Sequence, residues 1–343
     1  MKNNNDMTKK DHLTKTYIGD NVIFADVVNY AVYDGVQVIK PEVLEDGNTV
    51  ATSCIYKGDD FRLTFERTRD VRKIARKNSG DNTCYMVFGA ENQSQLHYAM
   101  PVKAMTYDVL EYICQIENRK KTFRAISEAK KAGEEPLEKS PDNEEFLSSW
   151  KADDKLVPVV TIVINFGEKK WDAPVTLHEM FDKTKRKFQR NRVIREMIPD
   201  YKFILIDPHQ MSEDDFERMN TNLKTVLRAI AYARDKNKIE LLEKIDTPLD
   251  RIEWEIINKY TGMSVDVPEE KEVKKMSEGL KKYLEEREDK VRIESEAKGR
   301  DEGEKKLGAL IDSLINAGRN DEIKKVTSDA EYRQKLYVEF GIE

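Results

Sequence analysis

Residues 84–93 read Cys84-Tyr85-Met86-Val87-Phe88-Gly89-Ala90-Glu91-Asn92-Gln93, an apolar run that ends in polar residues. The run is apolar enough to be a buried strand, and the two-residue period of a strand places Glu91 and Gln93 on one face. An acid and an amide that project together from the end of a core strand suggest a metal-dependent site. Asp70 lies upstream in a separate segment and could meet them in space. This pattern points to cleavage of phosphodiester bonds.

The length and composition of the chain limit what it can be. With 343 residues it can form one large domain with an appendage. A net charge of −6 argues against a generally basic DNA-coating protein, so contacts with nucleic acid must come from local patches. No apolar run approaches the roughly 20 residues that span a membrane, and the first residues do not resemble a signal peptide. The three cysteines form no metal or redox motif and fit a reducing compartment, so we expect a cytoplasmic protein with no membrane partner.

The order of helical and strand-like patterns predicts an α/β fold. Apolar residues at helical spacing predict a helix over 21–33 that carries Asp26. Pro101 is expected to open a long helix that runs to about residue 131. Strands are expected at 52–56, 61–68, 84–93, 157–167 and 201–206. Strands interspersed with helices indicate a mixed sheet flanked by helices.

The chain divides by composition at about residue 246. Residues 1–246 are predicted to form the α/β domain, with a polar insertion at about 132–154 that contains glycine and proline. Residues 247–343 are predicted to form a helical region, much of which is strongly charged. These C-terminal helices are candidates for self-association into a homo-oligomer.

Three acids are candidates for a site that binds Mg²⁺ or Mn²⁺. These ions take hard oxygen ligands, often one or two carboxylates together with the phosphate of the substrate. Asp70 and Glu91 supply two carboxylates, and Asp26 would add a third from its helix. Simpler interpretations remain open for each: Asp70 in a surface ion pair with neighbouring arginines, Glu91 at a solvated strand end, and Asp26 as a cap or salt-bridge residue.

Two groups of basic residues are candidates for contact with DNA. The first surrounds Asp70 and comprises Arg67, Arg69, Arg72, Lys73, Arg76 and Lys77. The second is a run over residues 183–195, for which a solvated helix face is an equally good interpretation. Each phosphate that such residues neutralise steepens the salt dependence of binding. The four histidines show no spacing of metal ligands, so zinc is not supported.

The order of several short motifs resembles that of a known protein group. The motifs are Phe24-Ala25-Asp26-Val27-Val28-Asn29, Arg69-Asp70-Val71, Phe88-Gly89-Ala90-Glu91-Asn92-Gln93-Ser94, Met100-Pro101-Val102-Lys103 with Tyr107, and Val157 to Gly167 followed by Trp171. Over about residues 20–246 the chain resembles the Rpn-type recombination-promoting nuclease and transposase group of the PD-(D/E)XK nuclease superfamily. A Gly-Arg-Asp-Glu-Gly segment at 299–303 is similar to the repeats that end many members.

The resemblance implies a restriction-endonuclease-like fold and a role for each matched residue. Asp70 and Glu91 would be the metal-binding acids, and Asp26 the acid borne by a helix. Gln93 stands where the superfamily pattern has lysine, and glutamine can only orient water through hydrogen bonds. Lys103, on the following helix, is a candidate to supply the missing charge, although a lysine in a first turn is commonly solvated.

The resemblance also implies an activity, and the sequence leaves an alternative open. The implied activity is that of a Mg²⁺- or Mn²⁺-dependent DNA endonuclease, which acts in recombination or in the movement of transposable elements. Asp26, Asp70, Glu91 and Gln93 would be its catalytic residues, and its DNA contacts would come from Arg69, Arg72, Lys73 and Lys103. The alternative is a nuclease fold with little or no catalysis, which serves as a DNA-binding or scaffolding module.

Overall fold

The computed structural model describes residues 12–58, 61–80, 83–136, 138–181, 192–235 and 237–342. These residues form two compact units, Met1–Gly279 and Leu280–Glu343. Most of the second basic run lies outside the described residues, which exclude 182–191. The predicted domain division at about residue 246 stays a prediction.

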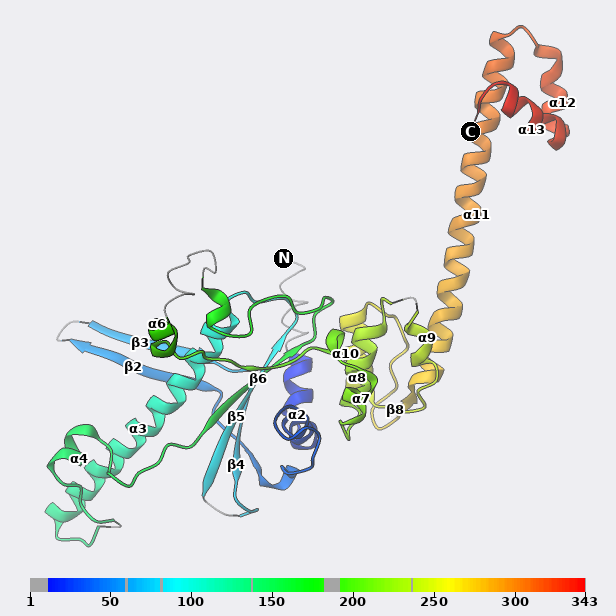
Figure 1. Cartoon of the computed structure of the whole chain (residues 1–343). Helices are drawn as coiled ribbons and strands as arrows, with labels where there is room; N and C mark the ends of the chain where they lie inside the picture. Colours follow the sequence, from blue (N-terminus) through cyan, green and yellow to red (C-terminus); the bar gives the residue numbers. More distant parts are fainter. Residues whose placement is uncertain are drawn as a thin grey trace. The chain divides into compact units, whose positions relative to one another are not determined.

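A five-stranded mixed sheet forms the centre of the first unit (Figure 1). Its strands lie in the order β1 (Leu44–Asp46), β4 (Val71–Arg76), β5 (Cys84–Gln93), β6 (Val159–Asn165) and β7 (Ile204–Ile206). The pairs β1–β4 and β4–β5 are antiparallel, and the pairs β5–β6 and β6–β7 are parallel. The predicted α/β class with a mixed sheet and flanking helices is therefore confirmed.

The helix α3 (Met100–Ala132) connects the two parallel central strands. Parallel neighbours need a crossover connection of this kind, because their chain directions match. Pro101 occupies the first turn, where its missing N–H costs no hydrogen bond. Gly133 ends the helix with a φ of 76°, which glycine adopts without strain. The predicted helix agrees with α3 to within one residue at each end.

The helix α2 (Asn21–Tyr33) also follows the prediction. The side chain of Asp20 accepts hydrogen bonds from the backbone N–H groups of Val22 and Ile23 and so caps the first turn. The buried residues of α2 include Phe24, Val27 and Val28, as well as Asp26. The helix contacts both β1 and β7, at the two edges of the sheet.

The strand β4 was not predicted as a separate element. Its burial alternates, and the buried positions are Val71, Lys73 and Ala75. A lysine in the middle of the buried face hides the two-residue apolar period by which a strand is recognised. The predicted strands at 52–56 and 61–68 form a separate two-stranded sheet, with β2 at Val50–Gly58 and β3 at Phe61–Thr68.

Helices complete the first unit, and α8 and α10 are in contact. Among the described residues, further helices include α4 (Asn143–Ser148), α6 (Arg192–Met197), α7 (Glu213–Glu217), α8 (Leu223–Tyr232), α9 (Ile239–Leu242) and α10 (Arg251–Thr261). A short antiparallel pair, β8 (Pro248–Leu249) with β9 (Lys274–Lys275), joins the end of this unit to the segment before α10.

The second unit is helical. It contains most of α11 (Met276–Asn316), followed by α12 (Ile323–Ser328) and α13 (Ala330–Glu339). Its core is made by Leu310, Leu314, Val326 and Leu336. Throughout the part of the chain that the structure describes, no helix combines the length and the apolar character needed to cross a membrane.

Candidate active site

The antiparallel register of β4 and β5 brings Asp70 beside Glu91. Val71, the first residue of β4, pairs with Ala90. A carboxylate oxygen of Asp70 accepts a hydrogen bond of 2.9 Å from the backbone N–H of Asn92. In return, the backbone N–H of Asp70 donates to Glu91 Oε1 at 3.4 Å. Two acids that are 21 residues apart in the sequence thus lie side by side where β4 begins and β5 ends, Glu91 bound to the backbone of Asp70 and Asp70 to the backbone of Asn92.

Each of these acids also faces a lysine. Lys15 Nζ lies 3.0 Å from Asp70 Oδ1, and Lys103 Nζ lies 2.8 Å from Glu91 Oε2. The Glu91 side chain is 1% exposed, whereas that of Lys103 is 27% exposed. Burial raises the pKa of Glu91, the charge of Lys103 opposes this rise, and the charge of Asp70 adds to it. The two ammonium groups offset the negative charge that the acids concentrate here.

Lys103 occupies the first turn of α3, which brings its charge to the end of β5. Its ammonium group also lies 5.9 Å from the ring centre of Tyr107, whose hydroxyl donates to the carbonyl of Thr68 at 3.0 Å. By the alternation of the strand, Gln93 shares the face of β5 that carries Glu91. A lysine from the neighbouring helix is therefore present beside the site, in a chain that has Gln93 at the usual lysine position.

Asp26 is engaged elsewhere. It is 2% exposed, and both carboxylate oxygens accept hydrogen bonds from the segment before α8. The donors are the backbone N–H of Asn220 at 2.9 and 3.0 Å, the backbone N–H of Thr221 at 2.8 Å, and the hydroxyl of Thr221 at 2.6 Å. These four contacts make Asp26 an anchor between α2 and that segment, which is the capping role left open by the sequence.

The predicted gathering of three acids is not found in the structure. Within the described residues, which include all three acids, there is no group of three or more acidic, histidine or cysteine side chains that could hold a metal ion. Asp70 and Glu91 meet, but Asp26 does not complete the set. The remaining pair still fits Mg²⁺, because that ion is commonly bound through one or two carboxylates and retains water or substrate oxygens. The lysine ammonium groups beside both acids show that this edge accommodates positive charge.

Two of the predicted DNA-contacting residues are buried in ion pairs. Arg69 is 3% exposed and donates to Asp108 Oδ1 and to the hydroxyl of Thr161, both at 2.7 Å. Lys73 is 1% exposed and donates to Asp46 Oδ1 at 2.5 Å. Their placement does not support the prediction that they contact DNA, because their charges are directed into the protein.

Arg72 and Lys103 are less enclosed, but both are paired. Arg72 forms two hydrogen bonds to the carboxylate of Glu111, at 2.9 and 2.7 Å, and its side chain is 15% exposed. Of the four basic residues proposed for DNA contact, only Lys103 is held by an acid of the candidate site.

Asn92 has a feature that its sequence position did not reveal. It is 8% exposed, and neither its side-chain nitrogen nor its side-chain oxygen has a hydrogen-bond partner within the described structure. Leaving a buried polar group unsatisfied costs about 1–3 kcal/mol. By the alternation of β5, this unpaired amide lies on the face opposite Glu91 and Gln93, where it is available to a ligand or an ordered water molecule.

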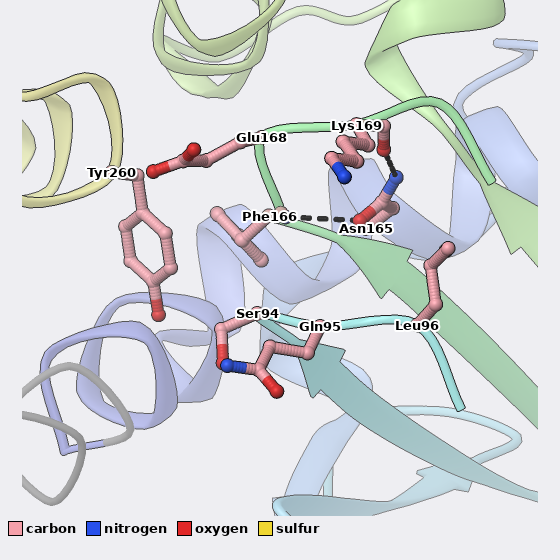
Figure 2. A pocket seen from close by; sticks show the side chains of 9 residues that line it. Ser94, Gln95, Leu96, Asn165, Phe166, Glu168, Lys169 and Tyr260 are labelled. Carbon is pink, nitrogen blue, oxygen red and sulfur yellow. Dashed lines mark hydrogen bonds between the residues drawn. The ribbon is translucent and has the colours of Figure 1, made fainter.

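A cleft opens where β5 and β6 end (Figure 2). The first residue of its wall, Ser94, directly follows Gln93 at the end of β5. Its volume is about 520 Å³. Its wall is formed by Ser94, Gln95, Leu96, Asn165, Phe166, Gly167, Glu168, Lys169 and Tyr260. The two strands are parallel, so their carboxyl ends meet at this edge, which is the usual place for ligands in open α/β sheets.

The fold and the acid pair define the class: an α/β protein whose mixed sheet carries paired carboxylates at one edge. Residues 144–255 match the model of a family described as "Putative transposase, YhgA-like". That family is Rpn-like and belongs to the PD-(D/E)XK nuclease superfamily, so the resemblance predicted from the sequence is confirmed. Asp70 and Glu91 precede the matched residues. No curated protein and no solved structure matches the chain.

Proposed function

We propose that this protein is a divalent-metal-dependent DNA endonuclease that acts in recombination or in the movement of transposable elements. The family match supports a nuclease-like role associated with transposition. The observation that carries the proposal is the meeting of Asp70 and Glu91 at the end of β5, with Lys103 at 2.8 Å from Glu91. An acid pair in which Glu91 is buried and Asp70 is 17% exposed is costly to maintain, and such pairs occur often at functional sites.

In this proposal Asp70 and Glu91 hold Mg²⁺ or Mn²⁺. Such an ion, when bound, withdraws charge from the scissile phosphate and lowers the pKa of a bound water. The chain itself supplies the orientation. The backbone N–H of Asn92 donates to the Asp70 carboxylate, and the backbone N–H of Asp70 donates to the Glu91 carboxylate. Both carboxylates are thereby preorganised.

Gln93 and Lys103 divide the task that one lysine performs in the superfamily pattern. Gln93 orients the attacking water through its amide, which can both donate and accept hydrogen bonds. Lys103 supplies positive charge near the developing negative charge on the phosphate. Its partner is Glu91, so its ammonium group is already held at the site.

Plasmid nicking with Mg²⁺ or Mn²⁺ tests the proposal. We expect nicking by the natural protein and its loss in Asp70→Ala and in Glu91→Ala. Lys103→Met should lower the rate while leaving the protein folded. Asp26→Asn serves as the contrast, because its contacts are structural: it should lower the melting temperature and leave the rate per folded molecule nearly unchanged. Undiminished nicking in both alanine variants rejects the proposed chemistry.

A second candidate is a nuclease-fold module that binds DNA or partner proteins without cutting. It is favoured by Gln93 at the lysine position and by the engagement of Asp26 away from the acid pair. Divalent-ion titration distinguishes the two candidates. If millimolar Mg²⁺ and Mn²⁺ leave the melting temperature of the natural protein and of Asp70→Ala equally unchanged, the non-catalytic module is the better description.

A further inference from the structure

Each acid of the candidate site has one carboxylate oxygen bound to the backbone and one beside a lysine. Asp70 Oδ2 accepts from the backbone N–H of Asn92, and Glu91 Oε1 accepts from the backbone N–H of Asp70. The other oxygen of Asp70, Oδ1, lies 3.0 Å from Lys15 Nζ. The other oxygen of Glu91, Oε2, lies 2.8 Å from Lys103 Nζ. The lysines thus contact the two oxygens on which the described residues place no backbone hydrogen bond.

A short helix over residues 12–19 brings Lys15 to this position. Its buried residues are Thr14, Tyr17 and Ile18, whose spacing of three and four gives the helix one buried face. The hydroxyl of Tyr17 donates to Glu253 Oε1, on α10, at 3.2 Å. Lys15 lies at the margin of the buried face, and its side chain is 40% exposed. The backbone at Lys15 is therefore held by the core, while the flexible stem of the side chain leaves its ammonium group able to move.

The pair of Lys15 with Asp70 is the more exposed of the two lysine–acid pairs. The Asp70 side chain is 17% exposed and that of Glu91 is 1% exposed. Water around a pair weakens the attraction between its charges. A competing cation therefore displaces the ammonium group of Lys15 more readily than that of Lys103.

A divalent ion at Asp70 would compete with Lys15 for the same oxygen. Mg²⁺ binds carboxylate oxygens at about 2.0–2.1 Å, and phosphate oxygens of the substrate commonly share its coordination. The ammonium group that leaves Asp70 Oδ1 stays beside the site, because the helix over 12–19 holds its backbone. A phosphate at the site then offers this group a new negative partner.

We propose that Lys15 is a phosphate-binding residue whose ammonium group is released from Asp70 by the divalent ion. In the absence of the ion it neutralises Asp70, and in its presence it contacts a phosphate of the DNA. Ion binding and DNA binding therefore strengthen each other through this one side chain. This inference rests on the proposed function and adds to it a residue from outside the acid-bearing strands.

Calorimetric titration of the full chain with Mn²⁺, in the absence of DNA, tests the release. Lys15→Met removes the competing ammonium group and should tighten Mn²⁺ binding by about two- to fivefold, the effect of one partly exposed ion pair. A variant that fails to fold cannot produce this gain. Lys15→Arg keeps the charge and should bind Mn²⁺ as the natural protein does.

Lys224→Met is the matched control for the titration. Lys224 forms a similar pair, 2.9 Å from Glu217, with an acid outside the candidate site. Its substitution should leave the affinity for Mn²⁺ unchanged. Unchanged or weaker Mn²⁺ binding in Lys15→Met overturns the inference, as does the same gain in Lys224→Met.

Fluorescence anisotropy with a labelled DNA duplex tests the second partner of Lys15. With Ca²⁺ in place of Mg²⁺, Lys15→Met should reduce the slope of log affinity against log salt by about 0.9, the effect of one phosphate contact. In EDTA the natural protein and Lys15→Met should have the same slope, because Asp70 then holds the ammonium group. An equal difference in both conditions, or no difference in either, contradicts the exchange of partners.

Plasmid nicking separates these results from the proposed function. If the natural protein does not nick, but Lys15→Met tightens Mn²⁺ binding and lowers the slope only with Ca²⁺, the endonuclease proposal fails and the role of Lys15 stands. If the natural protein nicks and Lys15→Met binds Mn²⁺ with unchanged affinity, the role of Lys15 fails and the endonuclease proposal stands.

Discussion

Replacing Arg69 by methionine tests whether this residue stabilises the fold or contacts DNA. The Arg69 side chain is 3% exposed and that of Asp108 is 10% exposed, with 2.7 Å between the paired atoms. Methionine preserves much of the volume but removes the charge. Removing one partner of a buried ion pair costs about 3–5 kcal/mol, because the other charge is left buried without compensation.

The surroundings of Asp108 place the expected loss near the lower end of that range. After the substitution, the carboxylate would still accept hydrogen bonds from the hydroxyls of Thr161 at 2.6 Å and Tyr201 at 2.7 Å. These neutral donors offset part of the charge. We therefore expect Arg69→Met to lower the free energy of unfolding by about 3 kcal/mol. In Arg69→Met with Asp108→Asn, the uncompensated charge is absent, so the combined loss should be smaller than the sum of the two single losses.

Urea denaturation at neutral pH measures these quantities. Lys77→Met is the control, since Lys77 belongs to the same basic cluster but is exposed, and its substitution should change stability by less than about 0.5 kcal/mol. Arg69→Met with the stability of the natural protein, or exact additivity in the double substitution, would refute the structural role. A DNA-contacting arginine would instead show unchanged stability with weaker, less salt-dependent DNA binding.

Three further predictions concern packing and electrostatics elsewhere in the protein. Gly279→Ala should destabilise the protein, because the added Cβ would lie 2.6 Å from the ring of Trp254. Gly299→Ala, in the same helix, adds a Cβ that meets nothing within 4 Å. Measured by thermal unfolding, Gly299→Ala should stabilise the protein by about 0.5–1 kcal/mol. Burial raises the pKa of Glu253 above its ordinary value of 4.5, so its favourable contribution is present below that value and is lost as the pH rises through the raised pKa. The melting temperature of the natural protein should accordingly fall relative to that of Glu253→Gln as the pH rises, and parallel pH profiles would contradict this. Asn92→Leu removes two unpaired polar atoms and should raise the free energy of unfolding by about 1–3 kcal/mol in urea, while a loss of stability would mean that the amide has a partner.

The sequence predicted the elements whose patterns are locally consistent. The strand that ends at Gln93 and the helix that opens with Pro101 have the expected periodicity and end signals, and both are present. The approach of Asp70 to Glu91 was also anticipated, because each lies at the end of an apolar element. Lys73 shows where this reasoning fails. Its aliphatic stem occupies a core position while its ammonium group finds Asp46, so the strand that contains it reads as a basic surface segment.

Asp26 shows a second limit of sequence reasoning. An acid on the buried face of a helix is compatible with a metal site and with a buried anchor. The choice depends on which backbone N–H groups it meets in three dimensions. Those of Asn220 and Thr221 lie almost 200 positions away and leave no local signal near residue 26. The ion pair between Arg69 and Asp108 is also non-local, because it joins the segment before β4 to the N-terminal third of α3.

The electrostatics of the acid pair bear on the choice between an enzyme and a scaffold. Glu91 is nearly completely buried, and both its burial and the charge of Asp70 raise its pKa. A glutamine at this position would also accept a hydrogen bond from the backbone N–H of Asp70, without the cost of burying a charge. Two carboxylates, each paired with a lysine, are therefore an expensive way to close the end of a strand. In the proposed function, a divalent ion would take the place of the lysine ammonium groups at the two carboxylates, and its binding would use the negative charge that a purely structural role leaves without a purpose.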